Sequence, residues 1–413
     1  MIVDNLGGLP TGDTDDPVLV HTPRDGIPHV VDSPEDLAEA AHVLARASAP
    51  VALDVERAQG FRYGSDPYLV QIRREDVGTV LVDTHALPDL RLLGPALSGT
   101  WILHSASQDL PNLRQVGLDT TDLFDTELAA RLVGLDRFGL AAVCEQVLGL
   151  ALVKDHQAAN WSVRPLPKDW LRYAALDVEL LTEARRRLAM RLHDLDRWEW
   201  ATEEFDHVLH MAAPAPKVDR WRLLPGASKI TSRRELAVLR ELWEAREDVA
   251  RRIDLAPGRL VRSQALVRAA QQPPRNRRAL LSFGEFRSPV ARTHVDVWLR
   301  AINRAVTMDE DDLPPKRSPA PRGAVPQARN WQRIDPEAHA RLQAVRGAIS
   351  RRAETLGIAQ EVLLEPKVQR WVAWAPLDPS IALTRAVAAR LDESDARQWQ
   401  KRLVAGALAD ALS

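Results

Sequence analysis

Two acidic residues at the end of a short apolar stretch are the first that could do chemistry together. Asp54 and Glu56 close segment 50–56, whose sequence Pro-Val-Ala-Leu-Asp-Val-Glu is typical of a buried strand. Side chains two residues apart on a strand leave the same face, so both carboxylates can reach one cation. The pair by itself is equally compatible with a strand end that meets water, so its meaning depends on other acids.

Three further residues extend this set. Asp109 falls in the first turn of a predicted helix at 108–116, where the positive end of the helix dipole tolerates an anion. Tyr173 and Asp177 are four residues apart in a second predicted helix, so they share one face. The small and apolar residues 174–176 indicate that this helix is buried, where an acid is costly without a positive partner.

The elements that must position these residues alternate as in an α/β protein. Three predicted strands follow one another closely, which favours an antiparallel start to the sheet, and strands and helices alternate after them. The expected strands are 50–56, 68–73, 79–83 and 101–104, and the expected helices are 88–97, 108–116 and a long helical pattern over 169–210.

Length and composition set the wider frame. The chain has 413 residues, of which 45% are hydrophobic and 27% charged, so we expect two or three globular domains. The single cysteine, Cys144, excludes an internal disulfide and a cysteine zinc cluster. Neither a signal peptide nor a membrane span is apparent, and we expect a cytoplasmic protein without membrane partners.

Charge is distributed unevenly along the chain. Residues 1–210 contain 19 basic and 34 acidic residues, a net charge of −15. Subtraction from the chain totals of 55 and 57 leaves 36 and 23 for residues 211–413, a net charge of +13. Basic domains tend to bind polyanions and clustered carboxylates attract divalent cations, although both halves could also be ordinary solvated surfaces.

Proline-rich breaks divide the basic half. Residues 212–216 and 309–330, the latter with five prolines, separate helical segments at about 232–305 and 335–411. The two helical segments look related, which predicts an internal duplication. At an offset of 103 residues, Ala250, Ile253, Leu255, Ala256 and Leu260 match Ala353, Leu356, Ile358, Ala359 and Leu363.

Taken together, the four acids and the tyrosine resemble the DEDD superfamily of 3′–5′ exonucleases, tyrosine subtype. The histidine subtype would need histidine where this chain has Arg172. One departure is Asn160, where ribonuclease D proteins commonly carry aspartate before the tryptophan. Beyond the acids, the segments that look like ribonuclease D are 53–56, 60–63, 68–72, 124–130, 161–166 and 173–178, within residues 28–210.

The resemblance implies a domain order. We expect an N-terminal extension at 1–27, a ribonuclease H-like exonuclease domain with a mixed sheet at 28–211, and a linker at 212–230. The helicase-and-ribonuclease-D C-terminal (HRDC) domain would follow at 231–308, then a proline-rich linker at 309–332 and a second, diverged HRDC-like helical domain at 333–413. The helical domains would bind nucleic acid, or they could be purely architectural or bind other proteins.

The resemblance also implies the chemistry. Asp54, Glu56, Asp109 and Asp177 would hold two divalent cations, Mg²⁺ or Mn²⁺, and Tyr173 would orient the attacking water. The enzyme would release nucleoside 5′-monophosphates from the single-stranded 3′ end of RNA, with transfer-RNA precursors as the implied substrate.

Two other functions stay open from the sequence. A 3′–5′ DNA exonuclease in repair would use the same acids, and an inactive nucleic-acid-binding adaptor would need only the fold. The residues expected to contact substrate are Phe61, Arg62, Tyr63, Lys154 and Arg164.

Overall fold

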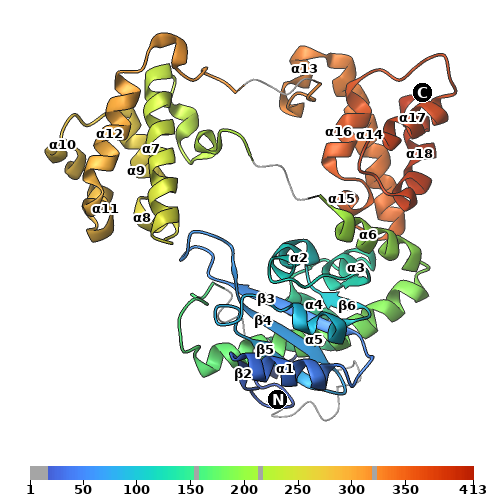
Figure 1. The fold of residues 1–413 in the computed structure, drawn as a ribbon. Coiled ribbons are helices and arrows are strands. Elements are labelled where there is room, and N and C mark those ends of the chain that lie inside the picture. The colour runs from blue at the N-terminus through green and yellow to red at the C-terminus, as the bar shows by residue number, and fades with distance from the viewer. Residues whose placement is uncertain (1–16, 153–157, 213–216, 319–322) are drawn as a thin grey trace.

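The computed structural model describes residues 17–152, 158–212, 217–318 and 323–413. The chain forms an N-terminal unit around a sheet (17–212), a central helical unit (217–318) and a C-terminal helical unit (323–413), shown in Figure 1. Within these described ranges, no helix is both long and apolar enough to cross a membrane.

The N-terminal unit is built on a six-stranded mixed sheet of order β2-β5-β4-β3-β6-β7. The central strand β3 pairs antiparallel with β4, which pairs antiparallel with β5, whereas the other pairings are parallel. This arrangement confirms the predicted antiparallel start and the α/β class. In sheet order the strands are Val30–Val31, Gly78–Val82, Pro67–Arg74, Val51–Arg57, Trp101–Leu103 and Leu123–Asp125.

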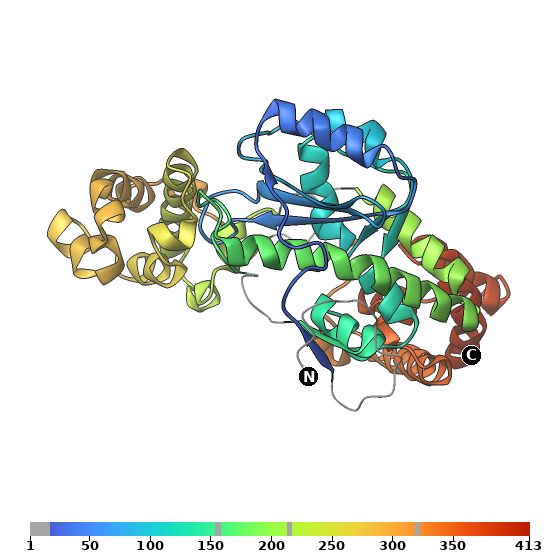
Figure 2. The ribbon, with the colours of Figure 1, turned by 90° about the horizontal axis from the view of Figure 1, so that it is seen from below.

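Helices cover both faces of this sheet. The 27-residue helix α5 (Lys168–Asp194) crosses one face, and α1 (Pro34–Leu44) lies on the other (Figure 2). Strand β3 alternates accordingly: Leu53 and Val55 belong to the main core, whereas Ala52 packs against Val178 and Leu181 of α5. Asp54 and Glu56 share the parity of Ala52, so they leave the sheet on the side of α5.

Further helices complete the N-terminal unit. They are the 3₁₀ helix η1 (Arg91–Leu97), α2 (Ala106–Gln115), α3 (Thr126–Leu132), α4 (Leu140–Leu148) and α6 (Trp198–His210). The predicted helix at 88–97 is therefore a shorter 3₁₀ helix with Pro95 inside it. The predicted pattern over 169–210 is two helices, because Asp196 adopts a left-handed conformation (φ 56°) that interrupts α5 and α6.

The described part of the expected N-terminal extension is integrated into this unit. Strand β1 (Val18–Val20) pairs parallel with β8 (Leu150–Leu152), and Val20 is buried. The backbone N–H of Arg24 donates to the Glu179 carboxylate on α5 at 3.0 Å. The described residues of the expected extension thus pack against the N-terminal unit, because their apolar side chains add a strand to it.

The central unit has a hydrophobic core of its own. Trp221 and Leu313 lie in this core, and Arg233 donates to the Leu313 carbonyl at 2.6 Å. Parts of both expected linkers, 212–230 and 309–332, are thus packed rather than free. Its elements are η2 (Arg220–Leu223), η3 (Ala227–Lys229), α7 (Arg233–Arg252), α8 (Pro257–Leu260), α9 (Ser263–Gln271), α10 (Arg277–Ser282), η4 (Gly284–Arg287), α11 (Pro289–Thr293), α12 (Val295–Val306) and η5 (Glu310–Asp312).

The C-terminal unit shares one continuous core with the N-terminal unit. Trp399 stacks on Trp200 of α6 with ring centroids 4.9 Å apart, and its indole N–H donates to Glu204 at 2.9 Å. The two units therefore form one packed body. The elements are η6 (Ala328–Asn330), α13 (Trp331–Ile334), α14 (Pro336–Leu356), α15 (Gln360–Leu363), α16 (Pro366–Trp374), α17 (Leu383–Asp392) and α18 (Gln398–Leu412).

The two helical units repeat one order of elements. Helices α14, α15, α16 and α18 begin at residues 336, 360, 366 and 398, and α7, α8, α9 and α12 begin at 233, 257, 263 and 295. Each pair of starts is 103 residues apart, the offset found in the sequence. Common element spacing supports a duplication, which stays our interpretation.

Candidate active site

Three of the four predicted acids converge at the end of β3. Asp54 and Glu56 leave β3 toward α5, and Asp177 on α5 points back at them. Each offers one carboxylate oxygen, and these oxygens all lie within 4.8 Å of one another. Glu56 and Asp177 are buried, and Asp54 keeps a small contact with solvent. We call these three residues the carboxylate cluster.

The close approach of α5 follows from its sequence. The face of α5 toward the sheet carries the small residue Ala174 and the apolar residues Val178 and Leu181, all buried. Small side chains let a helix lie close to a strand, so the short side chain of Asp177 can reach β3. The helical spacing of 174, 177, 178 and 181 was visible in the sequence and is what aims Asp177 inward.

Asp109 lies beside the carboxylate cluster but is not part of it. It enters from the first turn of α2, directly after β6, and is buried. Its carboxylate forms an ion pair with Arg57, the last residue of β3, with Nη1 and Oδ1 3.1 Å apart. The structure thus gives the fourth predicted acid a positive partner that the sequence did not predict.

Burial dominates the electrostatics of the four acids. It raises the pKa of Asp54 and raises the pKa values of Glu56, Asp109 and Asp177 well above the ordinary carboxyl range. The charge of Asp54 further raises the pKa of each of the other three, and the Arg57 guanidinium opposes this for Asp109 and Glu56. Proton uptake relieves this repulsion, and a bound divalent cation would relieve it with the acids ionised.

The donor set fits a hard divalent cation. The carboxylate cluster offers only oxygen atoms, which suit Mg²⁺ or Mn²⁺, and its oxygens are close enough to share one ion. An ion bound by Asp109 would lie close to the Arg57 guanidinium, which pairs with one of its two carboxylate oxygens.

Tyr173 completes the set predicted from the sequence. It lies one turn before Asp177 on α5, and the two side chains are hydrogen-bonded. Burial, together with the charges of Asp177 and Glu56, raises the pKa of Tyr173. Its hydroxyl therefore stays protonated at neutral pH and donates to the Asp177 carboxylate.

A further acid, Asp125, supports the site from behind. It ends β7 and caps α3, and it is buried. Its carboxylate accepts hydrogen bonds from the backbone N–H groups of Ser105 (3.2 Å), Ala106 (2.7 Å), Glu127 (2.9 Å) and Leu128 (3.2 Å). Burial raises the pKa of Asp125 to about 6. Sequence reasoning missed this residue, although it lies inside the segment 124–130 that carried the family resemblance.

Three of the residues predicted to contact substrate lie where the N-terminal and central units meet. Phe61, Arg62 and Tyr63 belong to the loop 58–65 that follows β3. The Tyr63 N–H donates to Asp254 of the central unit at 3.2 Å, and the Arg62 guanidinium pairs with the same carboxylate at 3.3 Å. Arg62 also donates to the Ser162 hydroxyl at 2.8 Å. These contacts assign Arg62 and Tyr63 to docking of the central unit.

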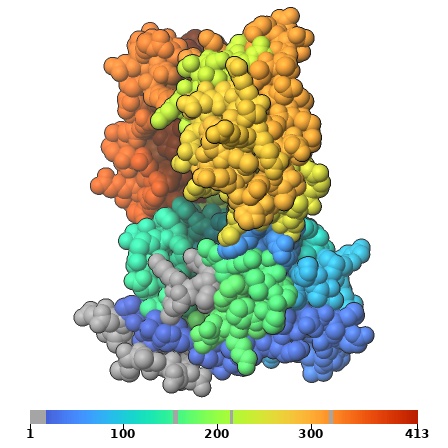
Figure 3. Space-filling view, turned by 90° about the vertical axis from the view of Figure 1, so that its left-hand side faces the viewer, coloured from blue at the N-terminus to red at the C-terminus, as the bar shows by residue number. Residues whose placement is uncertain are grey.

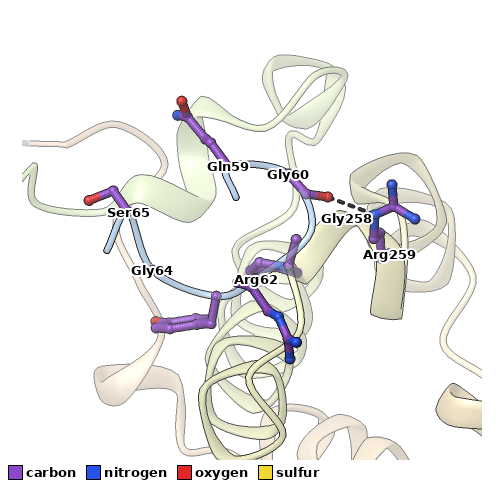
Figure 4. A pocket seen from close by; sticks show the side chains of 10 residues that line it. Gln59, Gly60, Arg62, Gly64, Ser65, Gly258 and Arg259 are labelled. Carbon is purple, nitrogen blue, oxygen red and sulfur yellow. Dashed lines mark hydrogen bonds between the residues drawn. The ribbon is translucent and has the colours of Figure 1, made fainter. Parts of the chain in front are cut away.

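The same loop binds the start of α8. The Ala256 N–H donates to the Phe61 carbonyl at 3.0 Å, and Arg259 donates to the Gly60 carbonyl at 2.7 Å, the bond dashed in Figure 4. The Arg259 guanidinium also lies 4.0 Å from the centre of the Phe61 ring. A pocket of about 500 Å³ opens between the two segments, and Figure 3 shows the central unit resting on this part of the N-terminal unit.

The Arg164 side chain, another predicted substrate contact, is engaged in contacts within the N-terminal unit. Arg164 pairs with the buried Asp83 at 2.5 Å and donates to the carbonyls of Trp161 (2.6 Å) and Tyr68 (2.8 Å), so it holds a loop against the sheet. Lys154 falls outside the described residues. Asn160, the departure from the family pattern, accepts from the Ser162 hydroxyl at 2.7 Å and so supports the serine that binds Arg62.

Comparison with protein families gives three matches along the chain. The profile of the 3′–5′ exonuclease family matches residues 28–193, which contain all four acids and Tyr173. The HRDC domain profile matches residues 235–302 in the central unit. The profile of a 3′ to 5′ exonuclease C-terminal domain matches residues 324–412.

Individual proteins agree with these matches. Ribonuclease D of Pseudomonas paraeruginosa is 30% identical over 277 residues, which are 65% of this chain and 68% of that protein. The crystal structure of a protein from Bifidobacterium adolescentis superposes with a TM-score of 0.87 at 35% identity, covering 96% of this chain and 100% of the other. Escherichia coli RNase D has the same fold, with a TM-score of 0.63 at 24% identity over 93% and 98% of the two chains.

Proposed function

Because this chain belongs to the ribonuclease D family of 3′–5′ exonucleases, we propose that it removes nucleotides from RNA 3′ ends by cation-dependent hydrolysis at the carboxylate cluster. The chain is an exoribonuclease. We propose which residues form its site, which cations it binds and which RNA it cleaves. The observation that carries it is the convergence of three acids from β3 and α5, two of them buried, with carboxylate oxygens within 4.8 Å of one another.

The side chains have distinct tasks in this proposal. Asp54, Glu56 and Asp177 would hold one divalent cation, and Asp54 and Asp109 a second. When bound, such cations lower the pKa of water and stabilise negative charge on phosphate oxygens. The protonated Tyr173 hydroxyl, fixed by Asp177, would orient the attacking water toward the terminal phosphodiester. Cleavage of the bond between that phosphorus and the 3′ oxygen of the preceding nucleotide releases a nucleoside 5′-monophosphate and leaves a 3′-hydroxyl on the shortened RNA.

The basic central unit supports an RNA substrate larger than the site itself. Residues 231–308 contain 16 arginines and 8 acidic residues, whereas residues 333–413 contain 12 basic and 10 acidic residues. A net positive unit beside an exonuclease gives a grip on phosphates that does not depend on sequence. The solved Escherichia coli RNase D is described as acting in structured RNA processing. We propose structured RNA with a single-stranded 3′ tail, such as a transfer-RNA precursor.

Substitution of one cluster acid tests the proposed function. Asp54→Asn keeps the shape of the side chain but removes the negative charge proposed to bind both cations. Turnover should therefore fall by at least about 10³-fold. The measurement is a time course with 3′-labelled and 5′-labelled RNA in Mn²⁺. The matched control is Asp169→Asn, an exposed acid in the first turn of α5. Near-normal turnover of Asp54→Asn would refute the assignment.

The same assay separates the alternative functions. Matched RNA and DNA 3′ tails distinguish an exoribonuclease from a DNA exonuclease, because only RNA offers 2′-hydroxyl contacts. Labelled mononucleotide should appear first from the 3′ label and only with a divalent cation. An idle adaptor would bind the RNA and release no mononucleotide under any of these conditions.

A further inference from the structure

Arg57 lies beside the acids, and the proposed function gives it no role. Its Nη1 atom lies 3.1 Å from the Asp109 carboxylate, 2.8 Å from the Gln108 carbonyl and 3.0 Å from the Asn112 side-chain oxygen. All three acceptors belong to α2. The guanidinium therefore ties the end of β3 to the helix that carries Asp109, immediately beside the carboxylate cluster.

The backbone and a second side chain build this position. The register between β3 and β4 shifts between Glu56 and Arg57, and such irregularities re-aim the side chain that follows. Asn112 is buried, and its amide nitrogen donates to the Ser65 carbonyl at 2.6 Å, which leaves its oxygen for Arg57. Two neutral acceptors, Asn112 and the Gln108 carbonyl, therefore share the Arg57 guanidinium with Asp109.

The pairing with Asp109 conflicts with a second cation. Asp109 is the predicted acid that stays outside the carboxylate cluster, and Arg57 stands against its Oδ1 atom. If a divalent cation bound to Asp109, it would lie a few ångströms from the positively charged Arg57 guanidinium and the two would repel each other. In contrast, a guanidinium matches the geometry of a phosphate with two parallel hydrogen bonds.

We propose that Arg57 is a resident counter-cation for Asp109, which keeps the second divalent cation weakly bound until the RNA phosphate draws the guanidinium away from Asp109. Arg57 is then a positioning residue that couples occupancy of the second cation position to substrate. The inference rests on the proposed function, because it assumes that the four acids hold cations.

Manganese binding without turnover tests this coupling. The 413-residue chain is titrated with Mn²⁺, and binding is monitored by calorimetry and electron paramagnetic resonance. We expect one ion to bind tightly and a second to bind more weakly. Arg57→Gln should tighten the second ion by about tenfold or more, because a positive charge beside Asp109 is removed. The control is Arg114→Gln. Arg114 lies at the C-terminal end of α2 and pairs with Asp119, which follows the helix. Unchanged Mn²⁺ binding in Arg57→Gln would overturn the proposal.

A second arm measures the effect of RNA on Mn²⁺ binding in the wild type and in Arg57→Gln. RNA with a non-hydrolysable, charged methylenephosphonate as its last linkage should tighten the second Mn²⁺ in the wild type. The same RNA should have a smaller effect on Arg57→Gln, where the second site is already free. Equal effects of the RNA on both proteins would contradict the coupling. If the wild type bound no Mn²⁺ at all, the proposed function itself would be contradicted. Failure of the coupling can therefore be told apart from failure of the proposed function.

Discussion

At the residue scale, the carboxylates of the site repel one another in the absence of cations. Asp54, Glu56, Asp109 and Asp177 are gathered in a buried region, and one guanidinium, Arg57, opposes their charges. Groups whose pKa is raised in the folded state retain protons that the unfolded chain has released. Their charge repulsion therefore lowers the free energy of unfolding of the cation-free protein at neutral pH.

The sign of this effect predicts the pH dependence of stability. Because the folded-state pKa values are raised, the contribution of these acids is most favourable below the unfolded value of about 4 and is lost as pH rises. The cation-free protein, kept in EDTA, should therefore melt at a lower temperature at about pH 8 than at about pH 5 through this contribution. Saturating Mn²⁺ should reverse the loss, with about 2.7 kcal/mol expected at a hundredfold excess over Kd.

The measurement is the thermal midpoint across this pH range with EDTA or with MnCl₂. Asp54→Asn serves as the internal control, since removal of one charge from the cluster should flatten the EDTA curve and weaken the Mn²⁺ response. Stability that increases with pH in EDTA for the wild type, and more steeply than for Asp54→Asn, would contradict the prediction.

At the element scale, helix starts and strand ends place the acids. β3 brings Asp54 and Glu56, the buried stripe of α5 brings Asp177, and the turn between β6 and α2 brings Asp109. This last turn is tied down by Asp125, whose carboxylate receives N–H groups from the starts of both α2 and α3. One buried acid thereby fixes two helices relative to the sheet.

Removal of that carboxylate should be costly. Asp125→Ala leaves four backbone N–H groups without their acceptor in a buried region, so the free energy of unfolding should fall by about 2–4 kcal/mol. The position of Asp109 should loosen with α2, which lowers turnover. The control is Asp335→Ala, which removes an N-cap with one hydrogen bond at α14 and should cost about 1 kcal/mol. Urea denaturation checks both values, and equal costs would argue against the clamp.

At the scale of the whole molecule, the two helical units are attached differently. The C-terminal unit shares the core of the N-terminal unit through α6 and Trp399, whereas the central unit keeps a separate core. The central unit instead docks through polar contacts to the loop 58–65, which begins two residues after Glu56. Its basic surface is therefore held close to the catalytic strand by a small number of contacts.

Asp254 offers a way to weaken this docking while the contacts of Ala256 and Arg259 with the same loop remain. The residue has φ of 47°, which glycine adopts without strain, so Asp254→Gly removes the contacts to Arg62 and Tyr63 at little cost to the backbone. The free energy of unfolding should change by less than about 1 kcal/mol, because the ion pair is exposed. The radius of gyration from small-angle scattering should increase, and KM for RNA should rise more than kcat falls.

The exposed acid Asp296 on α12 provides the control, since no ion pair is formed by it in the described part of the chain. Asp296→Ala should leave scattering and KM unchanged. If Asp254→Gly matched the wild type in both measurements, the loop contacts would not be what holds the central unit in place.

Local periodicity in the sequence determined which residues of the candidate site share a face. Residues 54 and 56 must share one side of a strand, and residues 173 and 177 must share one side of a helix, whatever the rest of the chain does. The antiparallel pairing of β3, β4 and β5 was equally readable, because these strands follow one another along the chain. The repeated helical spacing at an offset of 103 residues was also visible in the sequence.

Only the tertiary structure decided which distant groups face these acids. Arg57 reaches Asp109 across 52 positions, Tyr63 meets Asp254 across 191, and Trp399 packs on α6 some 199 residues from Trp200. Phe61, Arg62 and Tyr63 looked like substrate contacts for this reason: an aromatic and basic loop has the same composition whether it meets RNA or another domain. Such contacts arise when separate elements are packed together, and packing leaves no periodic trace in the sequence.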